Sequence, residues 1–220
     1  AGSLVNPAIL EACKEGCEIH NSASMSLDDV LAVTKARVAE GKTVVRLHTG
    51  DPAIYGAIQE QMDALKEMGI TYDVTPGVSS FLATAAALQQ EYTLPNVTQT
   101  VIITRMEGRT PMPEKEKLSM LASHGATMCI FLSVQMIDKV AAELIEGGYD
   151  KTTPVAIVVK ASWPDQRIIR GTLETIADVV AEEGVIRQAM IVVSRVLDTD
   201  YELSKLYDKG FAHMYRDAKQ

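Results

Sequence analysis

The segment from Arg46 to Gly56 constrains the fold more than any other part of this chain, because a tight turn joins a strand-like run to a helical one. Before the turn, Thr43–Leu47 is rich in β-branched residues and short enough for a buried strand. At the turn, Gly50 allows close approach of the backbone to a ligand, and Pro52 can open a helix. After the turn, apolar residues recur at helical spacing, namely Ile54, Ile58, Met62 and Leu65. Such loops bind ligands in open α/β sheets, although an ordinary strand-to-helix connection is an equal alternative here.

A second junction of the same kind follows the first. The strand expected over Thr71–Thr75 ends in the turn Pro76-Gly-Val-Ser-Ser80, and a helix of small residues is expected from Ser79. Upstream, Ser26 can cap a helix over residues 27–40. This order of elements is typical of a parallel α/β sheet, and the two loops together indicate one shared crevice.

The order of strands and helices changes after Tyr92–Thr98, which we take as a domain boundary. The elements expected beyond it are strand 99–104, helix 113–123, strand 127–132, helix 136–147, and strands 154–160, 167–172 and 189–196. The sequence therefore predicts an α/β protein with one domain over residues 1–93 and a second over 98–198. The tail over 199–220 could form a surface helix.

Composition indicates a folded protein of one or two domains. The chain has 220 residues, of which 47% are hydrophobic and 23% charged, as in ordinary globular proteins. The formal net charge of -8 argues against non-specific nucleic-acid binding, which depends on basic patches. No apolar stretch is long enough to span a membrane and no signal-peptide pattern is present, so we expect a cytoplasmic protein without a membrane partner.

Cysteine and histidine are not arranged as metal ligands. Cys13 and Cys17 have no second ligand pair at metal-site spacing, and Cys129 is remote in the sequence. The four histidines are scattered through unrelated segments, at positions 20, 48, 124 and 213. We therefore expect free thiols and no metal.

The two loops resemble the fingerprints of the tetrapyrrole methylases, the S-adenosylmethionine-dependent enzymes that methylate corrin and sirohaem precursors. The motifs are Gly50-Asp-Pro-x-x-Tyr-Gly56 and Pro76-Gly-Val-Ser-Ser80. Four further segments are similar, in order, to the members that methylate C11 of precorrin-4 or cobalt-precorrin-4 in cobalamin synthesis: 1–5, 104–113, 130–133 and 161–165. The resemblance runs to about Leu197. Family members begin with a strand, a Gly-rich loop and a helix, roughly 30 residues that this chain lacks, so it looks truncated at its N-terminus.

The resemblance implies two α/β domains with the cofactor cleft between them. The N-terminal domain would have a mostly parallel sheet without its first strand and helix, and the C-terminal domain a mixed sheet. Relatives form homodimers, so a homodimer is expected here as well. The cofactor would be S-adenosyl-L-methionine, with S-adenosyl-L-homocysteine as its product.

The cofactor-binding residues implied by the resemblance come from both domains. They are Gly50, Asp51, Ile54, Ser79, Ser80, Ser133 and Ala161. Several have simpler explanations: Asp51 could bond its own backbone, and Ser79 could be a helix N-cap. The match to the family favours the cofactor role.

The substrate implied by the resemblance is a tetrapyrrole with many carboxylates, which an acidic protein can bind only through local positive charge. Arg105 and Arg109 lie on one Gly- and Pro-bearing loop, and arginine pairs bidentately with carboxylate. Lys160 and Arg46 are second-choice contributors. Trp163 could stack on the macrocycle or anchor its own turn.

The reaction needs little acid–base machinery, because methyl transfer is an in-line displacement that depends mainly on positioning. His48 and Tyr55 are weak candidates for a proton-transferring residue, and packing of the first loop is the alternative role for each. Two other functions remain open: another tetrapyrrole or related methylase, such as a uroporphyrinogen III C-methyltransferase, or a non-catalytic remnant that binds the cofactor.

Overall fold

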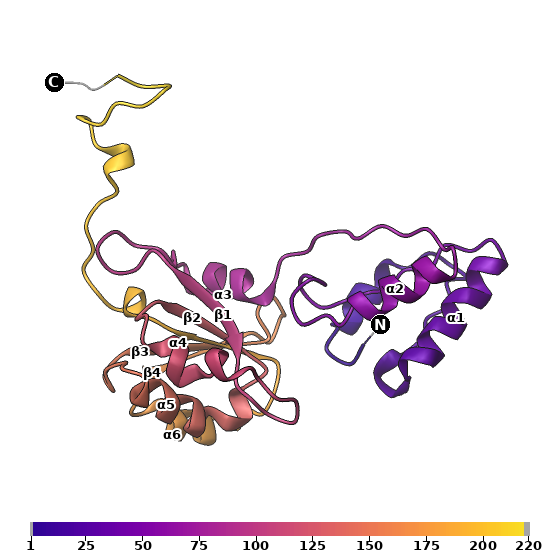
Figure 1. Cartoon of the computed structure of the whole chain (residues 1–220), viewed down its shortest axis with the longest axis horizontal. Helices are drawn as coiled ribbons and strands as arrows, with labels where there is room; N and C mark the ends of the chain where they lie inside the picture. Colours follow the sequence, from indigo (N-terminus) through magenta and orange to yellow (C-terminus); the bar gives the residue numbers. More distant parts are fainter. Residues whose placement is uncertain (1, 218–220) are drawn as a thin grey trace. The chain divides into compact units, whose positions relative to one another are not determined.

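The computed structural model describes residues 2–217 (Figure 1). The chain divides into two compact units, residues 1–83 and 84–220, and the division falls inside helix α3, Ser80–Leu88. The boundary that the sequence places at Tyr92–Thr98 stays a prediction, as do the domain limits 1–93, 98–198 and 199–220 and the cofactor cleft between the domains. Each unit is described below by itself.

The N-terminal unit is built from helices and extended loops. Two short 3-10 helices, η1 (Pro7–Ala12) and η2 (Ser22–Ser24), precede α1 (Leu27–Ala39) and α2 (Gln59–Glu67), which pack side by side (Figure 1). Helix α1 begins as the sequence predicts. The Ser26 hydroxyl accepts from the Asp29 N–H at 3.2 Å, and an Asp29 carboxylate oxygen accepts from the Ser26 N–H at 2.9 Å, which completes a capping box.

The strands predicted in this unit are not formed. Residues 43–47 and 71–75 have no regular secondary structure, and neither segment belongs to a ladder in the described part of the chain. β-branched residues favour an extended backbone, whereas a strand also needs a hydrogen-bonded neighbour, and local sequence cannot supply one. Helix α2 also begins later than the sequence suggests. The Asp51 carboxylate accepts from the Ala53 N–H at 2.8 Å, which makes a turn at Pro52 in place of a helix start.

The C-terminal unit contains one mixed five-stranded sheet, which confirms the mixed sheet expected there. Its strands are β1 (Val101–Arg105), β2 (Thr127–Phe131), β3 (Pro154–Val159), β4 (Arg167–Thr172) and β5 (Ala189–Val193). The spatial order is β1-β2-β5-β3-β4, with β1 and β2 parallel and every other neighbouring pair antiparallel. Each of these strands lies within a few residues of its predicted position.

Helices α4 (Leu118–Ala122), α5 (Ile137–Glu146) and α6 (Ile176–Glu182) lie together against this sheet (Figure 1). Three more 3-10 helices connect elements: η3 (Glu114–Glu116), η4 (Val134–Met136) and η5 (Arg195–Leu197). The core between helices and sheet is fully buried and apolar; its largest members are Leu118, Met128, Ile130, Leu144, Ile157, Ile176 and Ile191. Helices α4 and α5 approach closely at Gly147, where an added Cβ would lie 2.2 Å from the Ser119 carbonyl oxygen.

The predicted tail helix is wrong over the described residues 199–217. That segment holds only the 3-10 turn η6 (Lys205–Tyr207) and a closed loop that ends at Arg216. The Arg216 guanidinium donates to the carbonyl oxygens of Leu206, Asp208 and Phe211. Side-chain hydrogen bonds of this kind offer the backbone an alternative to a helix.

Strand direction decides where loops meet. Strands β1, β2 and β3 run the same way, so they end at one edge of the sheet, after Arg105, Phe131 and Val159. We call this the carboxyl edge. In the described part of the chain no helix is both long and apolar enough to cross a membrane.

Candidate functional site

Two loops of the N-terminal unit are clamped together by Asp51. One Asp51 carboxylate oxygen accepts from the Gly77 N–H at 2.9 Å, and the other accepts from the Ala53 N–H at 2.8 Å. A Cβ added to Gly77 would lie 2.1 Å from the Gly50 carbonyl oxygen, so no other residue fits at that crossing. The loops predicted to share a crevice, residues 48–57 and 76–80, are therefore in direct backbone contact. We call them the paired loops.

The paired loops bring four of the predicted cofactor residues together. Gly50 has a positive φ of 67°, and a Cβ there would lie 3.3 Å from Ser79 Cα and from the Ser80 nitrogen. The two N–H bonds hold the pKa of Asp51 below its usual range, with the Gly77 bond the larger cause, so the carboxylate stays ionised at neutral pH. Ser79 is buried and Ile54 is half-buried. Contact of these residues with a cofactor stays a prediction.

His48 and Tyr55 lie on the first of the paired loops. Partial burial, and then the charge of Arg46, lower the pKa of His48, so its imidazole is neutral at pH 7. Tyr55 is exposed and has a positive φ of 55°. These observations do not assign a proton-transfer role to His48 or to Tyr55. Arg46 donates to Gln61 Oε1 and to Ser22 Oγ, within the N-terminal unit.

The arginine-bearing loop follows β1 at the carboxyl edge, as the sequence places it. Arg105 donates to the carbonyl oxygens of Met106 at 3.2 Å, Thr110 at 3.3 Å and Pro111 at 3.1 Å. Arg109 is exposed, and the described residues offer it no hydrogen-bond or ion-pair partner. The two arginines, which the sequence treats alike, therefore differ: Arg105 is bonded within its own loop and Arg109 points to solvent.

Ser133 joins the ends of β1 and β2. Its hydroxyl donates to the Phe131 carbonyl oxygen at 2.6 Å and accepts from the Met106 N–H at 2.8 Å. The side chain is completely buried. A contact between this position and the predicted cofactor would therefore have to come from its backbone.

Lys160, Ala161 and Trp163 form the turn after β3, at the same edge. The Lys160 ammonium pairs with Asp165 at 2.5 Å and lies 5.2 Å from the centre of the Trp163 ring. The Trp163 N–H also donates to the Lys160 carbonyl oxygen at 2.9 Å. Trp163 thus anchors this turn, and much of the Lys160 charge is compensated by Asp165, whose pKa it lowers.

Strained backbone collects in these same loops. Eight non-glycine residues of the described chain have positive φ, a conformation that L-residues adopt only at a cost. Four lie at the carboxyl edge, where Gln188 precedes the antiparallel strand β5: Leu132, Lys160, Ser162 and Gln188. Two more, Tyr55 and Ala57, lie in the first of the paired loops. Such strain is retained mainly at functional sites, which supports a functional role for each of the two places taken by itself.

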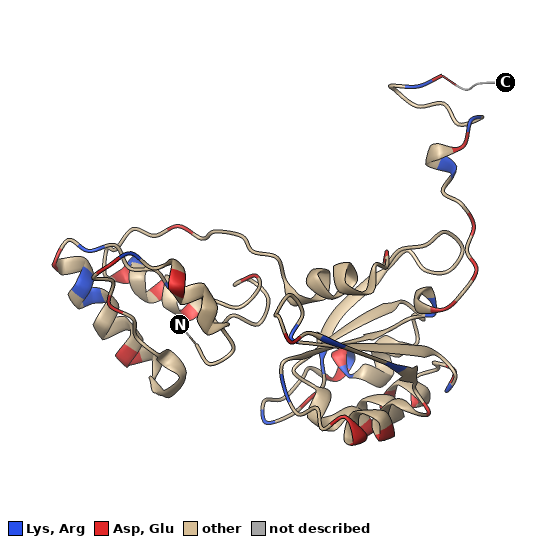
Figure 2. Ribbon diagram, turned by 180° about the vertical axis from the view of Figure 1, so that it is seen from behind, with Lys and Arg blue, Asp and Glu red and all other residues tan. Residues whose placement is uncertain are grey.

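Many acidic side chains of the C-terminal unit lie on its helices, whereas the loops at the carboxyl edge carry Glu107 and Asp165. Figure 2 shows acidic residues gathered on the helices of the C-terminal unit, where α5 and α6 carry Asp138, Glu143, Glu146, Asp178 and Glu182. The formal net charge of -8 therefore does not describe the loops that carry Arg105, Arg109 and Lys160. A separation of this kind allows an acidic protein to bind an anion locally.

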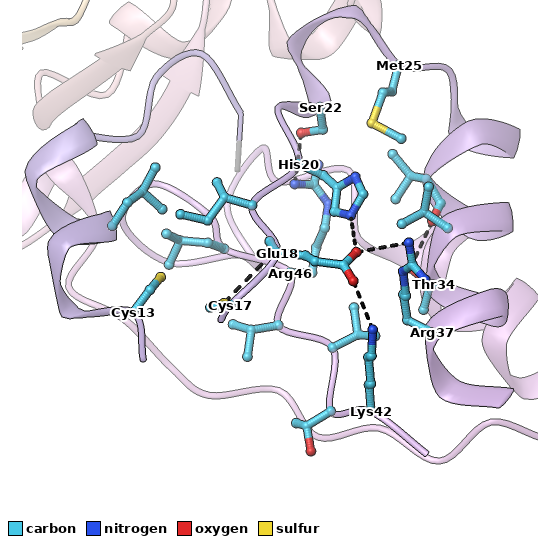
Figure 3. Close-up of a pocket in the computed structure, with 18 of the residues that line it drawn as sticks. Cys13, Cys17, Glu18, His20, Ser22, Met25, Thr34, Arg37, Lys42 and Arg46 are labelled. Carbon is cyan, nitrogen blue, oxygen red and sulfur yellow. Dashed lines mark hydrogen bonds and ion pairs between the residues drawn. The ribbon is translucent and has the colours of Figure 1, made fainter. Parts of the chain in front are cut away.

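The N-terminal unit also contains an open cavity of about 510 Å³, which sequence reasoning missed (Figure 3). Glu18 lies at its centre and pairs with Arg37 at 2.9 Å and with Lys42 at 2.8 Å. The Lys42 hydrogen bond is the main cause of the lowered pKa of Glu18. These charges are far apart in the sequence, so no spacing rule relates them. None of the predicted cofactor residues lines this cavity, and the described residues contain no cluster of three or more His, Cys, Asp or Glu that could hold a metal.

The family model described as Tetrapyrrole (Corrin/Porphyrin) Methylases matches residues 1–177. The cobalt-precorrin-4 C(11)-methyltransferase of Methanocaldococcus jannaschii is 59% identical over 217 residues, which cover 98% of this chain and 84% of the relative. The enzyme of the same name from Priestia megaterium is 47% identical, and the alignment covers 98% of this chain and 85% of the relative. The precorrin-4 C(11)-methyltransferase of a Sinorhizobium species is 45% identical, over 98% of this chain and 86% of the relative.

Solved structures agree with these sequences. The X-ray structure of a cobalt precorrin-4 methyltransferase, a cobalamin biosynthetic enzyme, superposes with a TM-score of 0.87 at 47% identity, covering 90% of this chain and 82% of that one. The uroporphyrin-III C-methyl transferase of Thermus thermophilus, in complex with S-adenyl homocysteine, has a TM-score of 0.73 at 23% identity, over 89% of this chain and 84% of that one. The second likeness shows the fold alone.

Proposed function

Because the chain belongs to the tetrapyrrole (corrin/porphyrin) methylase family, we propose that it transfers a methyl group from S-adenosyl-L-methionine to C11 of precorrin-4 or cobalt-precorrin-4 in cobalamin biosynthesis. The observation that carries this proposal is the 59% identity, along 98% of the chain, to a relative named for that reaction. The arginine-bearing loop at the carboxyl edge supports it, since the acceptor would be a polyanion. A cytoplasmic location belongs to the same proposal.

The paired loops suit the methionine part of the proposed donor, which carries a carboxylate and an ammonium group. Helix α3 begins at Ser80, and the N–H groups of Ser79 and Ser80 have no acceptor within the described residues. Free N–H groups at a helix N-terminus bind carboxylates. The ionised Asp51 carboxylate suits an ammonium group, and each of its oxygens accepts only one bond from the described residues. We propose that Gly50, Asp51, Ser79 and Ser80 hold this part of the donor.

The task of the protein in this reaction is to bind and to orient. The donor supplies an activated methyl group on a sulfonium, and transfer to a ring carbon needs the two partners held in line. In this proposal Asp51 fixes the paired loops and thereby the place of the donor. The donor contacts that the sequence predicts for Ile54, Ser133 and Ala161 belong to the same proposal, and Ser133 could make its contact only through its backbone. Arg109 would attract and orient the carboxylates of the acceptor.

A mass measurement tests the proposal. The full-length protein is incubated with S-adenosyl-L-methionine and, separately, with precorrin-4, cobalt-precorrin-4 and uroporphyrinogen III. We expect one added methyl group on one or both of the first two compounds, and a donor labelled in its methyl carbon should give a single product signal assigned to C11. Methylation of uroporphyrinogen III alone would assign the chain to another reaction of its family. Donor binding without transfer to any acceptor would leave a non-catalytic binding protein.

A further inference from the structure

We propose that Arg105 is a positioning residue, which gives the arginine-bearing loop the shape that presents Arg109, and that of the two only Arg109 contacts a carboxylate of the substrate. This inference rests on the proposed function, because it divides the work within the same site. It replaces the equal roles that the sequence alone suggests for the two arginines.

The hydrogen bonds of Arg105 hold the backbone of the arginine-bearing loop. A guanidinium has five N–H donors, and three of those in Arg105 donate to the carbonyl oxygens of Met106, Thr110 and Pro111. The loop is thus wrapped around the side chain that precedes it. Carbonyl groups that are bonded in this way cannot turn without breaking charge-assisted bonds, which are stronger than neutral ones. Arg105 therefore stiffens the stretch of backbone that contains Arg109.

A further hydrogen bond fixes the same loop at its base, and Gly108 lies near Met136. The Met106 N–H donates to the buried Ser133 hydroxyl. This bond anchors the start of the loop, which follows β1, to the end of β2. Gly108 passes Met136, whose Cε would lie 3.7 Å from an added Cβ. Arg109 is the next residue and is exposed, with no partner in the described chain. A free cation on a loop fixed at several points is suited to an anionic ligand.

The substitution Arg105→Lys distinguishes a role of the side chain's shape from a role of its charge. It keeps the positive charge, but its single ammonium group cannot reproduce the planar fork that reaches three carbonyls. If Arg105 acts through the loop, Arg105→Lys should behave like Arg105→Ala. If Arg105 acts by its charge, lysine should restore most of the function. The matching pair is Arg109→Lys and Arg109→Ala, and Arg170→Ala, on the exposed side of β4, is the control.

Amide hydrogen exchange tests the positioning role without any substrate. We expect faster exchange over residues 106–112 in both Arg105 variants, and parental exchange there in both Arg109 variants and in Arg170→Ala. Unchanged exchange in the Arg105 variants would overturn the inference. This readout stands even if the parent methylates none of the precursors, an outcome that would overturn the proposed function alone.

The second test is steady-state kinetics with whichever precursor the parent protein methylates. We expect Arg105→Lys to lower kcat/KM for the tetrapyrrole roughly tenfold or more, since a small misplacement of binding groups is costly, with KM for the donor unchanged. Arg109→Lys should retain most of the activity. The double variant Arg105→Ala with Arg109→Ala should be no worse than Arg109→Ala, because one residue acts through the other. Parental kinetics in Arg105→Lys would show that the shape of the guanidinium is not needed, and additive losses in the double variant would show that Arg105 contributes independently of Arg109. Either result would overturn the inference.

Discussion

Asp51 is the residue whose loss should most disturb the paired loops. Both of its carboxylate oxygens accept hydrogen bonds from backbone N–H groups. Asparagine has only one acceptor oxygen, so its NH₂ group would face one of these N–H donors. We expect Asp51→Asn to speed amide exchange at Gly77 and to weaken binding of S-adenosyl-L-homocysteine roughly tenfold. Calorimetric titration measures the second effect. Asp63→Asn, an exposed change on α2, is the control. Equal affinities in the parent and in Asp51→Asn would show that the clamp does not shape the donor site.

The same carboxylate should make the clamp sensitive to acid. The pKa of Asp51 is lower in the folded protein than its ordinary value, so the interaction is fully present above that ordinary value, about 3.9. It is lost as the pH falls through the lowered folded value. We expect protection of the Gly77 amide to decline in that acidic range in the parent and to be independent of pH in Asp51→Asn. Exchange measured over the same pH range checks this, and identical profiles would contradict it.

His48 should not act as the base of the reaction. Burial and the neighbouring Arg46 keep its imidazole neutral at pH 7, but no geometry around it indicates a proton to be moved. General acid–base groups contribute about 10² to 10⁴ in rate. We therefore expect His48→Gln to lower kcat by less than roughly tenfold and to leave the shape of the pH profile unchanged. A loss of about a hundredfold, with one limb of the profile removed, would instead assign His48 a catalytic role.

At this scale the sequence predicts backbone constraints better than side-chain bonds. Gly50 and Gly77 could be recognised as turn residues because glycine permits conformations and approaches that other residues do not. The three carbonyl partners of Arg105 could not, since they converge on the guanidinium only after the loop has closed. Burial of the Ser133 hydroxyl likewise follows from where β1 and β2 end, which a motif does not record.

Among the elements, the strands of the C-terminal unit were predictable because each is a short apolar run that finds a neighbour in the sheet. Residues 43–47 have the same kind of sequence and remain outside any ladder in the described chain. Strand formation therefore depends on a pairing partner as well as on local preference. Helix α1 needs no such partner, because its capping box is encoded within four consecutive residues.

Helix α1 should lose stability when its cap is removed. Ser26 satisfies one of the N–H groups that open the helix, and Asp29 returns the bond. We expect Ser26→Ala to lower the free energy of unfolding of the N-terminal unit by about 1 kcal/mol. Denaturant titration measures the change. Ser24→Ala, an exposed change in the short η2 turn, gives a comparison outside the cap, and an equal effect of the two substitutions would argue against a specific capping contribution.

Gly147 sets how closely α4 and α5 pack. An added methyl group would lie 2.2 Å from the Ser119 carbonyl oxygen and 2.5 Å from Ala122 Cβ, so one helix has to move. We expect Gly147→Ala to destabilise the C-terminal unit by about 1–3 kcal/mol, as overpacking does. Thermal unfolding checks this. Gly108→Ala is the control, because its Cβ would meet only Met136 Cε at 3.7 Å. Equal melting temperatures would mean that the helices can separate at no cost.

The whole molecule carries an apolar surface that a single chain does not cover. The described part of the C-terminal tail keeps a closed loop around Arg216, yet four large apolar side chains on it are more than 80% exposed: Leu203, Tyr207, Met214 and Tyr215. Exposed apolar surface of this kind marks an interaction site. The homodimer expected from the sequence would place a second copy of this chain on that surface. We therefore propose that the tail contributes to a homodimer.

Light scattering on two variants tests this arrangement. The parent should have the mass of a dimer at micromolar concentrations. Replacing Tyr207, Met214 and Tyr215 together by Ser should shift the equilibrium toward monomer, because burial of each side chain contributes roughly 1.5–3 kcal/mol. Tyr72→Ser, a change of an exposed tyrosine in the N-terminal unit, should leave the mass unchanged. A dimeric triple variant would place the interface elsewhere, and a monomeric parent would contradict the homodimer itself.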